Sequence, residues 1–339
     1  MKLGIIGTGR MAKRAIKELE YVPEIEVVAV YNPNYDHAKS FASRIQDAAG
    51  SALSAPIKAA PNLEAFGEIV DAVYIATPHG THHHYAQRML EIRKHVLCEK
   101  PMVMDADQAK ELYNLAQEHG LVLMEAIKTA YCPGFVRLQE VVESGVIGKL
   151  VDVEAAFTRL TLPGGREFEP GGYGGSFAEF GTYNMLPIFR FLGIGYKGVN
   201  FQSVITETGV DGYTKAIFDF GDAFATSKTG LTAKSEGQLI IAGEKGYILA
   251  PSPWWRTSYF EVRYEDPNKI DRYECEFEGD GLRYEFREFT RRIDALSEGI
   301  GQNVEEPEED TADGLIFSKE KEEAMARAGV YDQFRKSRG

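Results

Sequence analysis

The chain has 339 residues, of which 44% are hydrophobic, and a formal net charge of −13 at pH 7. Such a length allows two domains with separate cores, and the acidic charge argues against a nucleic-acid partner because no dense Lys/Arg run offsets it. No apolar run approaches the roughly 18 residues of a membrane span. Three widely spaced cysteines, and an N-terminus without the apolar core of a signal peptide, predict a cytoplasmic protein without disulfides.

The first predicted element is a short apolar strand, Lys2–Ile6, followed by Gly7-Thr8-Gly9-Arg10-Met11-Ala12. This is the G-x-G-x-x-G/A pattern, in which the first Gly allows a tight turn and the second lets the backbone approach a pyrophosphate. A helical run through Leu19 and a second strand at residues 25–31 give the context that the pattern requires. The N–H groups at the start of the helix suit a bound phosphate, so we expect NAD or NADP here.

The end of the second strand bears on the choice between the two cofactors. NAD-binding folds usually place Asp or Glu about 20 residues after the glycine loop, where the carboxylate binds the ribose hydroxyls. Asn32 occupies this place, and its amide can hydrogen-bond a 2′-hydroxyl without repelling a 2′-phosphate. A cation for such a phosphate would come from Arg10, His37 or Lys39. Both cofactors stay open, with a slight preference for NADP.

Strand and helix patterns alternate up to about residue 124. Further strands are predicted at residues 57–60, 72–76, 95–98 and 122–125, and a helix at 105–118 ends before Gly120. This alternation is typical of an α/β fold, a Rossmann doubly wound parallel sheet with helices on both faces. Ligands of such sheets bind beyond the carboxyl ends of the strands. We therefore assign residues 1–124 to an NAD(P)-binding domain.

Residues 125–339 show a different pattern, that of an α+β domain for substrate binding and dimerisation. Short β-rich runs separated by tight turns predict a large, mostly antiparallel open sheet. The runs are 150–159, 200–207, 214–220, 223–229, 238–242, 259–264 and 272–277, and helices are expected at 135–144, 176–192, 284–297 and 311–327. Trp254-Trp255 is expected to serve packing rather than sugar binding. The glycine-rich stretch 164–175 is either a loop over the substrate or a plain surface loop.

A run of histidines lies between the predicted strand at 72–76 and the next helix. His79 and His83 are four residues apart, a spacing that two zinc ligands on a helix can have. A full ligand set is missing, so no metal site is predicted. Thr81 and the histidines are expected to serve the start of the helix beside the cofactor.

Glu99-Lys100-Pro101 follows the predicted strand at 95–98. Proline lacks a backbone N–H and restricts the residue before it to an extended conformation. Lys100 is therefore held in one direction beside the predicted cofactor. A fixed lysine next to a dinucleotide indicates acid–base chemistry coupled to hydride transfer.

Several motifs together resemble the Gfo/Idh/MocA oxidoreductases. They are the glycine loop, Ala76-Thr77-Pro78, His82, His95-Val96-Leu97-Cys98-Glu99-Lys100-Pro101, Gly145-x-x-Gly148 and Gly174-Gly175-x-x-x-Glu179-x-Gly181-x-Tyr183. The resemblance implies NAD(P)-dependent oxidation or reduction of sugars, polyols or related carbonyl compounds. It also implies a second domain whose open sheet often carries a dimer interface, so we expect a homo-oligomer.

The resemblance assigns roles to individual residues. Lys100 matches the catalytic lysine, and Glu99 matches a residue near the nicotinamide and its ribose. With the glycine loop, the expected cofactor-binding residues are Gly7, Thr8, Gly9, Arg10, Met11, Asn32, Ala76, Thr77, Pro78, His82, Glu99 and Lys100. The expected substrate-binding residues are Lys100, Glu179 and Tyr183.

The second half of the chain departs from the family pattern in two places. Many members have Asp-x-x-x-His where this chain has Glu179-x-x-x-Tyr183, and all seven histidines lie at or before His119. A Tyr at this place is the proposed proton donor in the similar subgroup of glucose–fructose oxidoreductase and dimeric dihydrodiol dehydrogenase. Ala130-Tyr131-x-Pro133 stands where Arg-Phe-x-Pro is common.

These residues predict the chemistry of carbonyl reduction and its reverse. Nicotinamide would supply the hydride, and Tyr183 the proton, with the ammonium of Lys100 favouring the phenolate. The two roles can also be reversed. Two alternatives remain: an NAD(P)-binding regulator without turnover, for which Ala130 and Glu179 leave room, and a glycosidase that uses tightly held NAD for transient oxidation.

Overall fold

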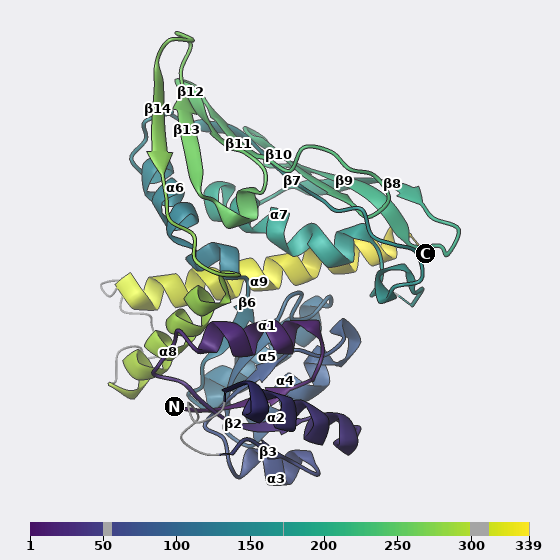
Figure 1. Ribbon diagram of the computed structural model, residues 1–339. Coiled ribbons are helices and arrows are strands. Elements are labelled where there is room, and N and C mark those ends of the chain that lie inside the picture. The colour runs from purple at the N-terminus through teal and green to yellow at the C-terminus, as the bar shows by residue number, and fades with distance from the viewer. Residues whose placement is uncertain (50–55, 172, 299–311, 339) are drawn as a thin grey trace. The chain divides into compact units, whose positions relative to one another are not determined.

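The computed structural model describes residues 1–49, 56–171, 173–298 and 312–338 (Figure 1). They divide into two compact units, Met1–Lys128 with Gly279–Lys321, and Thr129–Glu278 with Glu322–Gly339. The first division, after Lys128, lies close to the boundary expected at residue 124. The return of residues 279–321 to the first unit was not expected from the sequence, which placed everything after residue 124 in one domain.

In the described residues of the first unit, six strands form one parallel sheet in the order β3-β2-β1-β4-β5-β6. The strands are β1 (Lys2–Ile6), β2 (Glu26–Tyr31), β3 (Lys58–Ala59), β4 (Ala72–Ile75), β5 (His95–Glu99) and β6 (Leu123–Ala126). This order confirms the predicted Rossmann fold. The order reverses between β1 and β4, so ligands are expected beyond the carboxyl ends of these two strands.

The first unit also contains helices, and at least one of them begins at a side-chain cap. They are α1 (Arg10–Leu19), α2 (Tyr35–Ala49), α3 (Leu63–Gly67), η2 (His79–Thr81), α4 (His82–Glu91), α5 (Ala106–Glu118) and α8 (Leu282–Ser297). The Asp105 side chain accepts from two N–H groups of the first turn of α5. Helix α8 packs against α1, and Arg283 donates to both Glu18 carboxylate oxygens at 3.0 and 3.1 Å.

In the described residues of the second unit, eight strands form one sheet in the order β14-β13-β12-β11-β7-β10-β9-β8. They are β7 (Leu150–Thr158), β8 (Gly198–Ile205), β9 (Asp211–Asp219), β10 (Phe224–Gly230), β11 (Leu239–Gly243), β12 (Gly246–Ala250), β13 (Tyr259–Arg263) and β14 (Ile270–Glu274). Among these described strands only β7 and β10 pair in parallel, which confirms the mostly antiparallel sheet. The sequence predicted the turn before β12 but not that strand.

Helix α7 (Ser176–Leu192) covers one face of this sheet. The other described helices of the unit are η3 (Lys128–Tyr131), α6 (Pro133–Glu143), η4 (Arg166–Phe168), η5 (Trp254–Arg256) and the second part of α9 (Ala312–Lys336). Figure 1 shows α7 along that face. Asp211 caps α7 by accepting from Ser176 Oγ at 2.7 Å and the Phe177 N–H at 2.8 Å. On the opposite face Ile217 and Phe224 are exposed.

The bounds of α7 and α9 can be compared with those predicted from the sequence. Helix α7 has the predicted bounds, whereas α9 continues beyond the predicted end at residue 327 to Lys336. This last part packs Tyr331 and Phe334 against Phe177. Among the residues with a described position, no helix has the length and apolar character that crossing a membrane requires.

Candidate active site

The glycine loop lies at the point where the strand order of the parallel sheet reverses. Gly7 has φ +109°, and a Cβ atom there would stand 2.4 Å from the Ala76 carbonyl oxygen. Only glycine allows this conformation and this close approach. A Cβ atom on Gly9 would meet nothing within 4 Å, and α1 starts at the next residue without a side-chain cap. The open backbone and the helix start fit the pyrophosphate of NAD(P).

Asn32 joins the end of β2 to the glycine loop. Its Nδ2 atom donates to Thr8 Oγ1 at 2.9 Å, and its Oδ1 atom accepts from the Asn34 N–H at 2.9 Å. The amide therefore stands in a fixed orientation at the place where a carboxylate would bind ribose hydroxyls. His37 and Lys39, two of the candidate phosphate partners, are exposed at the start of α2.

His82 connects two of the segments that line the expected cofactor site. The ring is buried, with Nδ1 at 2.9 Å from the Pro101 carbonyl oxygen and Nε2 at 2.9 Å from that of Thr77. Thr81 forms no side-chain cap on α4, so the expected helix-start role is wrong for Thr81. Its hydroxyl instead lies 2.8 Å from that of Thr77. No cluster of three or more metal-ligating side chains occurs among the described residues.

Three neighbouring elements hold the segment that carries Lys100. Tyr74 of β4 donates to Glu99 Oε1 at 2.6 Å, and His82 of α4 contacts the Pro101 carbonyl. The Met102 N–H donates to Glu125 Oε1 of β6 at 3.0 Å. The Lys100–Pro101 peptide bond is cis, and Lys100 is buried. Sequence reasoning missed Tyr74 and Glu125, although a polar group in an otherwise apolar strand is a signal that can be searched for.

Glu285 of α8 brings another carboxyl group into this buried region. It is 1% exposed, and its Oε2 atom has no hydrogen-bond partner among the described residues. Burial raises the pKa of Glu285 well above its ordinary value, and the charge of Glu99 raises it further. Burial also raises the pKa of Glu99, against the opposing effect of the bond from Tyr74. The two carboxyl groups therefore keep a proton to a higher pH than exposed ones do.

Replacing Glu285 with Gln should stabilise the protein increasingly as the pH rises. Because its pKa is raised on folding, folded Glu285 binds a proton that the unfolded chain releases earlier, so its contribution to stability is full at low pH and is lost as the pH rises through the folded-state pKa. Gln has the same shape and needs no proton. In urea denaturation we expect no difference at pH 4.5 and a free energy of unfolding about 1–3 kcal/mol above wild type at pH 8.

Glu288 on the same helix provides a control of opposite sign. Burial raises its pKa, but hydrogen bonds from Arg291 and Arg292, at 2.8 and 2.7 Å, outweigh this and lower it. A lowered pKa contributes stability at high pH that is lost as the pH falls through it, so Glu288→Gln should destabilise the protein at pH 8. A Glu285→Gln variant that is also destabilised at pH 8 would contradict the retained proton.

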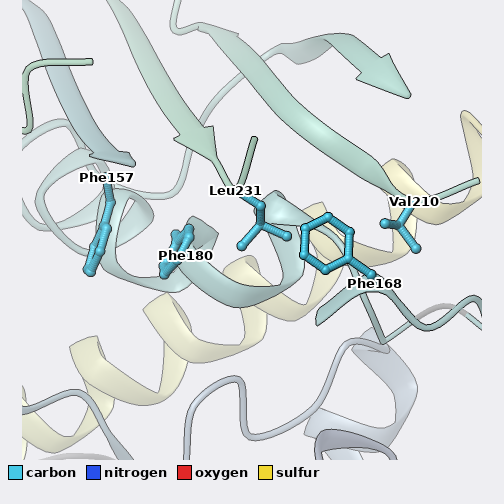
Figure 2. Packing of buried hydrophobic residues seen from close by; sticks show 5 residues of the cluster. All are labelled: Phe157, Phe168, Phe180, Val210 and Leu231. Atoms are coloured by element: carbon cyan, nitrogen blue, oxygen red, sulfur yellow. The ribbon is translucent and has the colours of Figure 1, made fainter. Parts of the chain in front are cut away.

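In the second unit, Tyr183 lies on α7 beside a buried aromatic cluster. The cluster consists of Phe157, Phe168, Phe180, Val210 and Leu231 (Figure 2), and Tyr183 and Trp255 pack against it. The Tyr183 ring is 5.2 Å from that of Phe157, which also stacks on Trp255 at 3.6 Å. Tyr183 is half-buried, so its ring is supported by packing without being enclosed.

Trp254 and Glu179 lie in the same unit as Tyr183. Trp254 is fully buried and donates from Nε1 to the Ala156 carbonyl at 3.0 Å, which agrees with the expected packing role. Glu179 lies one helical turn before Tyr183 and is buried, with Arg166 Nη2 at 3.5 Å and Arg159 Nη2 at 4.0 Å. Lys100 and Tyr183 belong to different units, so their pairing stays a prediction.

Comparisons with known proteins agree with the geometry of both units. The model of the oxidoreductase family with an NAD-binding Rossmann fold (GFO_IDH_MocA) matches residues 1–127, and the GFO/IDH/MocA C-terminal domain matches residues 135–249. Among solved structures, the 3-ketoreductase KijD10 from Actinomadura kijaniata has a TM-score of 0.77 at 23% identity, and the alignment covers 98% of this chain and 96% of that one. This likeness shows a common fold.

Two curated relatives span nearly the whole chain. The scyllo-inositol 2-dehydrogenase (NADP(+)) IolU of Bacillus subtilis is 27% identical over 97% of this chain and 98% of its own length. The trans-1,2-dihydrobenzene-1,2-diol dehydrogenase of Xenopus laevis is 28% identical over the same shares. A dTDP-3,4-didehydro-2,6-dideoxy-alpha-D-glucose 3-reductase of Actinomadura kijaniata is 30% identical over 73% of this chain and 70% of its own length. The chain belongs to the Gfo/Idh/MocA family of NAD(P)-dependent oxidoreductases.

Proposed function

We propose that Lys100 and Tyr183 are the acid–base pair of a dehydrogenase or reductase that acts on a sugar, a polyol or a related carbonyl compound. The proposal rests on the way the segment with Lys100 is held at the carboxyl edge of the parallel sheet. Bonds from β4, α4 and β6 fix its neighbours Glu99, Pro101 and Met102. Such preorganisation is what a group needs if it is to act on a substrate beside the cofactor.

When bound, NAD(P) supplies or accepts the hydride. The residues that would hold it are those of the glycine loop, Asn32, the segment Ala76-Thr77-Pro78 and Glu99. The protein must move one proton. In the reducing direction, Tyr183 Oη donates it to the carbonyl oxygen as that oxygen gains negative charge, and the ammonium of Lys100 stabilises the phenolate. The reversed assignment, with Lys100 as donor, uses the same two groups.

Variants of a related protein, whose structures are solved, are consistent with the choice of this pair. Structures of the Actinomadura kijaniata 3-ketoreductase with NADP and TDP-benzene include variants in which a lysine and a tyrosine are replaced. The two positions have nearly the same spacing there as Lys100 and Tyr183 have here.

A coupled screen tests the proposed activity directly. The purified protein is mixed with NADP⁺ or NADPH and with sugars, inositols, diols and dicarbonyl compounds, and nicotinamide absorbance is followed. We expect a change with at least one of these classes. A protein that binds the cofactor but gives no change with any class would favour the regulator. Cofactor that co-purifies with the protein, together with glycoside cleavage and no net change, would favour the glycosidase.

The amide of Asn32 leads us to propose a preference for NADP, which is also the cofactor in the name of the Bacillus subtilis relative. Asn32→Asp would place a carboxylate at the end of β2, beside Thr8. We expect the variant to raise the KM for NADP about tenfold or more, because the new charge repels a 2′-phosphate, and to change the KM for NAD far less. Steady-state kinetics with both cofactors measures this. A wild-type protein that strongly prefers NAD would contradict the proposal.

We further propose a cytoplasmic homodimer that pairs through the open face of the eight-stranded sheet. That face bears the exposed apolar side chains Ile217 and Phe224, and apolar patches of this kind mark interfaces. Sedimentation velocity distinguishes the dimer from a monomer, and a monomer at micromolar concentration would contradict the proposal. Cys98, Cys132 and Cys275 form no disulfide among the described residues, which suits a reducing compartment. Cell fractionation tests the location.

A further inference from the structure

The chain between β7 and α7 carries two arginines that the proposed proton transfer does not use. Arg159 directly follows β7, and Arg166 begins η4. Their side chains are 43% and 42% exposed. The carboxylates next to them, on Glu167 and Glu179, are buried. A molecule that arrives from solvent therefore meets guanidinium groups first, with the carboxylates beneath them.

The segment that carries these arginines is anchored to the rest of the unit. Phe168, at the end of η4, belongs to the buried cluster and lies beside Leu231 in Figure 2. The Gly175 N–H donates to the Glu167 carbonyl at 2.8 Å, which joins η4 to the start of α7. Arg159 is held from another side, because its guanidinium lies 5.3 Å from the centre of the Phe180 ring.

Both guanidinium groups converge on Glu179, one helical turn before Tyr183. Arg166 Nη2 is 3.5 Å from Glu179 Oε2, and Arg159 Nη2 is 4.0 Å from Oε1. Residues four apart on an α-helix lie on the same side of it, so Glu179 and Tyr183 share one side of α7. A substrate whose reacting oxygen meets Tyr183 would have the two arginines within reach of its other end.

The contacts of these arginines differ from those of a structural ion pair in the same unit. Arg190 donates twice to Glu323, at 2.8 and 3.1 Å, and both side chains are nearly buried. The carboxylate contacts of Arg159 and Arg166 are 3.5 to 4.0 Å long. Within the described residues, their only side-chain hydrogen bond is that from Arg166 to Glu179. Since a guanidinium has five N–H donors, both arginines keep donors for a ligand.

We infer that Arg159 and Arg166 form an anion subsite beside Tyr183, so that the substrate is a hydroxylated or carbonyl compound that also carries a carboxylate or a phosphate group. The planar guanidinium matches the geometry of both groups. The buried carboxylates of Glu167 and Glu179 offset the charge of the two guanidinium groups, so an anion would be recognised by their exposed N–H donors rather than by a net positive surface. The inference rests on the proposed role of Tyr183.

Calorimetric titration of the NADP⁺-loaded protein tests the subsite without depending on turnover. The probes are glucose, glucuronate and glucose 6-phosphate, which differ in the group at one end. We expect at least one anionic probe to bind about tenfold or more tightly than glucose. Tighter binding of glucuronate would identify a carboxylate substrate, and tighter binding of glucose 6-phosphate a phosphorylated one. If neither anion binds more tightly than glucose, the inference is wrong.

Variants assign the effect to the two arginines. R159Q and R166Q should each weaken binding of the favoured anion about tenfold and leave glucose binding within twofold, because only the charged group loses a partner. R137Q on α6 is the matched control, since Arg137 is 53% exposed and also pairs with a Glu of its own unit. Equal losses for glucose and the anion, or an equal loss in R137Q, would refute the subsite.

Two further measurements are planned, one for the case that a variant does not fold and one that separates the subsite from the proposed proton transfer. If a Gln variant fails to fold, the wild-type protein is used instead. It is first saturated with the favoured anion, and inorganic phosphate or acetate is then titrated in. If neither displaces the favoured anion, the subsite is refuted. Tyr183→Phe should keep anion binding within threefold while turnover is lost. A Tyr183→Phe protein with normal turnover would refute the proposed proton transfer and leave the binding result to stand or fall separately.

Discussion

Lys100→Met is expected to lower kcat by about 10²- to 10⁴-fold while the protein still binds NADPH with near-normal affinity. The substitution removes an ammonium group at the carboxyl edge of the parallel sheet and keeps a side chain of similar length. A positioned acid–base group contributes about that factor. The neighbouring bonds of Glu99 and Pro101 do not involve the lysine side chain, so the segment should keep its shape. Single-turnover absorbance measures the chemical step, and NADPH fluorescence measures binding.

Lys110→Met is the matched control for this prediction. Lys110 is an exposed lysine on α5 of the same unit, so its loss changes the net charge equally. We expect its kcat to stay within twofold of wild type. A Lys100→Met enzyme that retains more than about one-third of wild-type turnover would exclude the lysine from acid–base catalysis.

Tyr183→Phe is expected to cause a loss of similar size, about 10²- to 10⁴-fold in kcat. Phenylalanine keeps the ring that packs against Phe157, so the thermal midpoint should change little. The loss would therefore report the hydroxyl group alone. We expect the kcat of the wild-type protein to fall at high pH, and if Tyr183 is the proton donor this fall disappears in the variant. If Lys100 is the donor, that fall persists.

Tyr264→Phe controls for the loss of a hydroxyl group elsewhere in the second unit. Tyr264 follows β13, and its hydroxyl donates to Asp271 of β14 at 2.7 Å. Its replacement should leave kcat unchanged within twofold. Tyr183→Phe with wild-type turnover would show that the phenol is a packing group on the face of α7.

The parallel sheet and α7 could be predicted because each has a signal within its own stretch of sequence. Gly7 and the apolar strand before it identify the nucleotide fold, and Gly175 and Gly193 bracket α7 in conformations that favour glycine. The return of residues 279–321 to the first unit depends on contacts between distant segments, such as the ion pair between Glu18 and Arg283. No periodicity within either segment specifies that pairing. Strand β12 was missed because five residues after a tight turn give a weak signal.

The cofactor side of the candidate site was more predictable than the substrate side. The glycine loop and the segment after β5 are contiguous motifs, and each was found as one. Glu285 looks like an ordinary acid on an amphipathic helix, and only the fold shows that it is buried near Glu99. Arg159 follows a strand by one residue and resembles any loop cation. Its relation to Glu179 arises when the chain folds back between β7 and α7.

A crystal structure of the complex with NADP⁺ and a non-reacting substrate analogue would show whether Lys100 and Tyr183 act on the same oxygen. The quantities to measure are the distances from Lys100 Nζ and Tyr183 Oη to the analogue oxygen that stands for the reacting hydroxyl. We expect both atoms to lie within about 3.2 Å of it, the reach of a hydrogen bond. Either group more than about 6 Å away, with no single water between them, would contradict it.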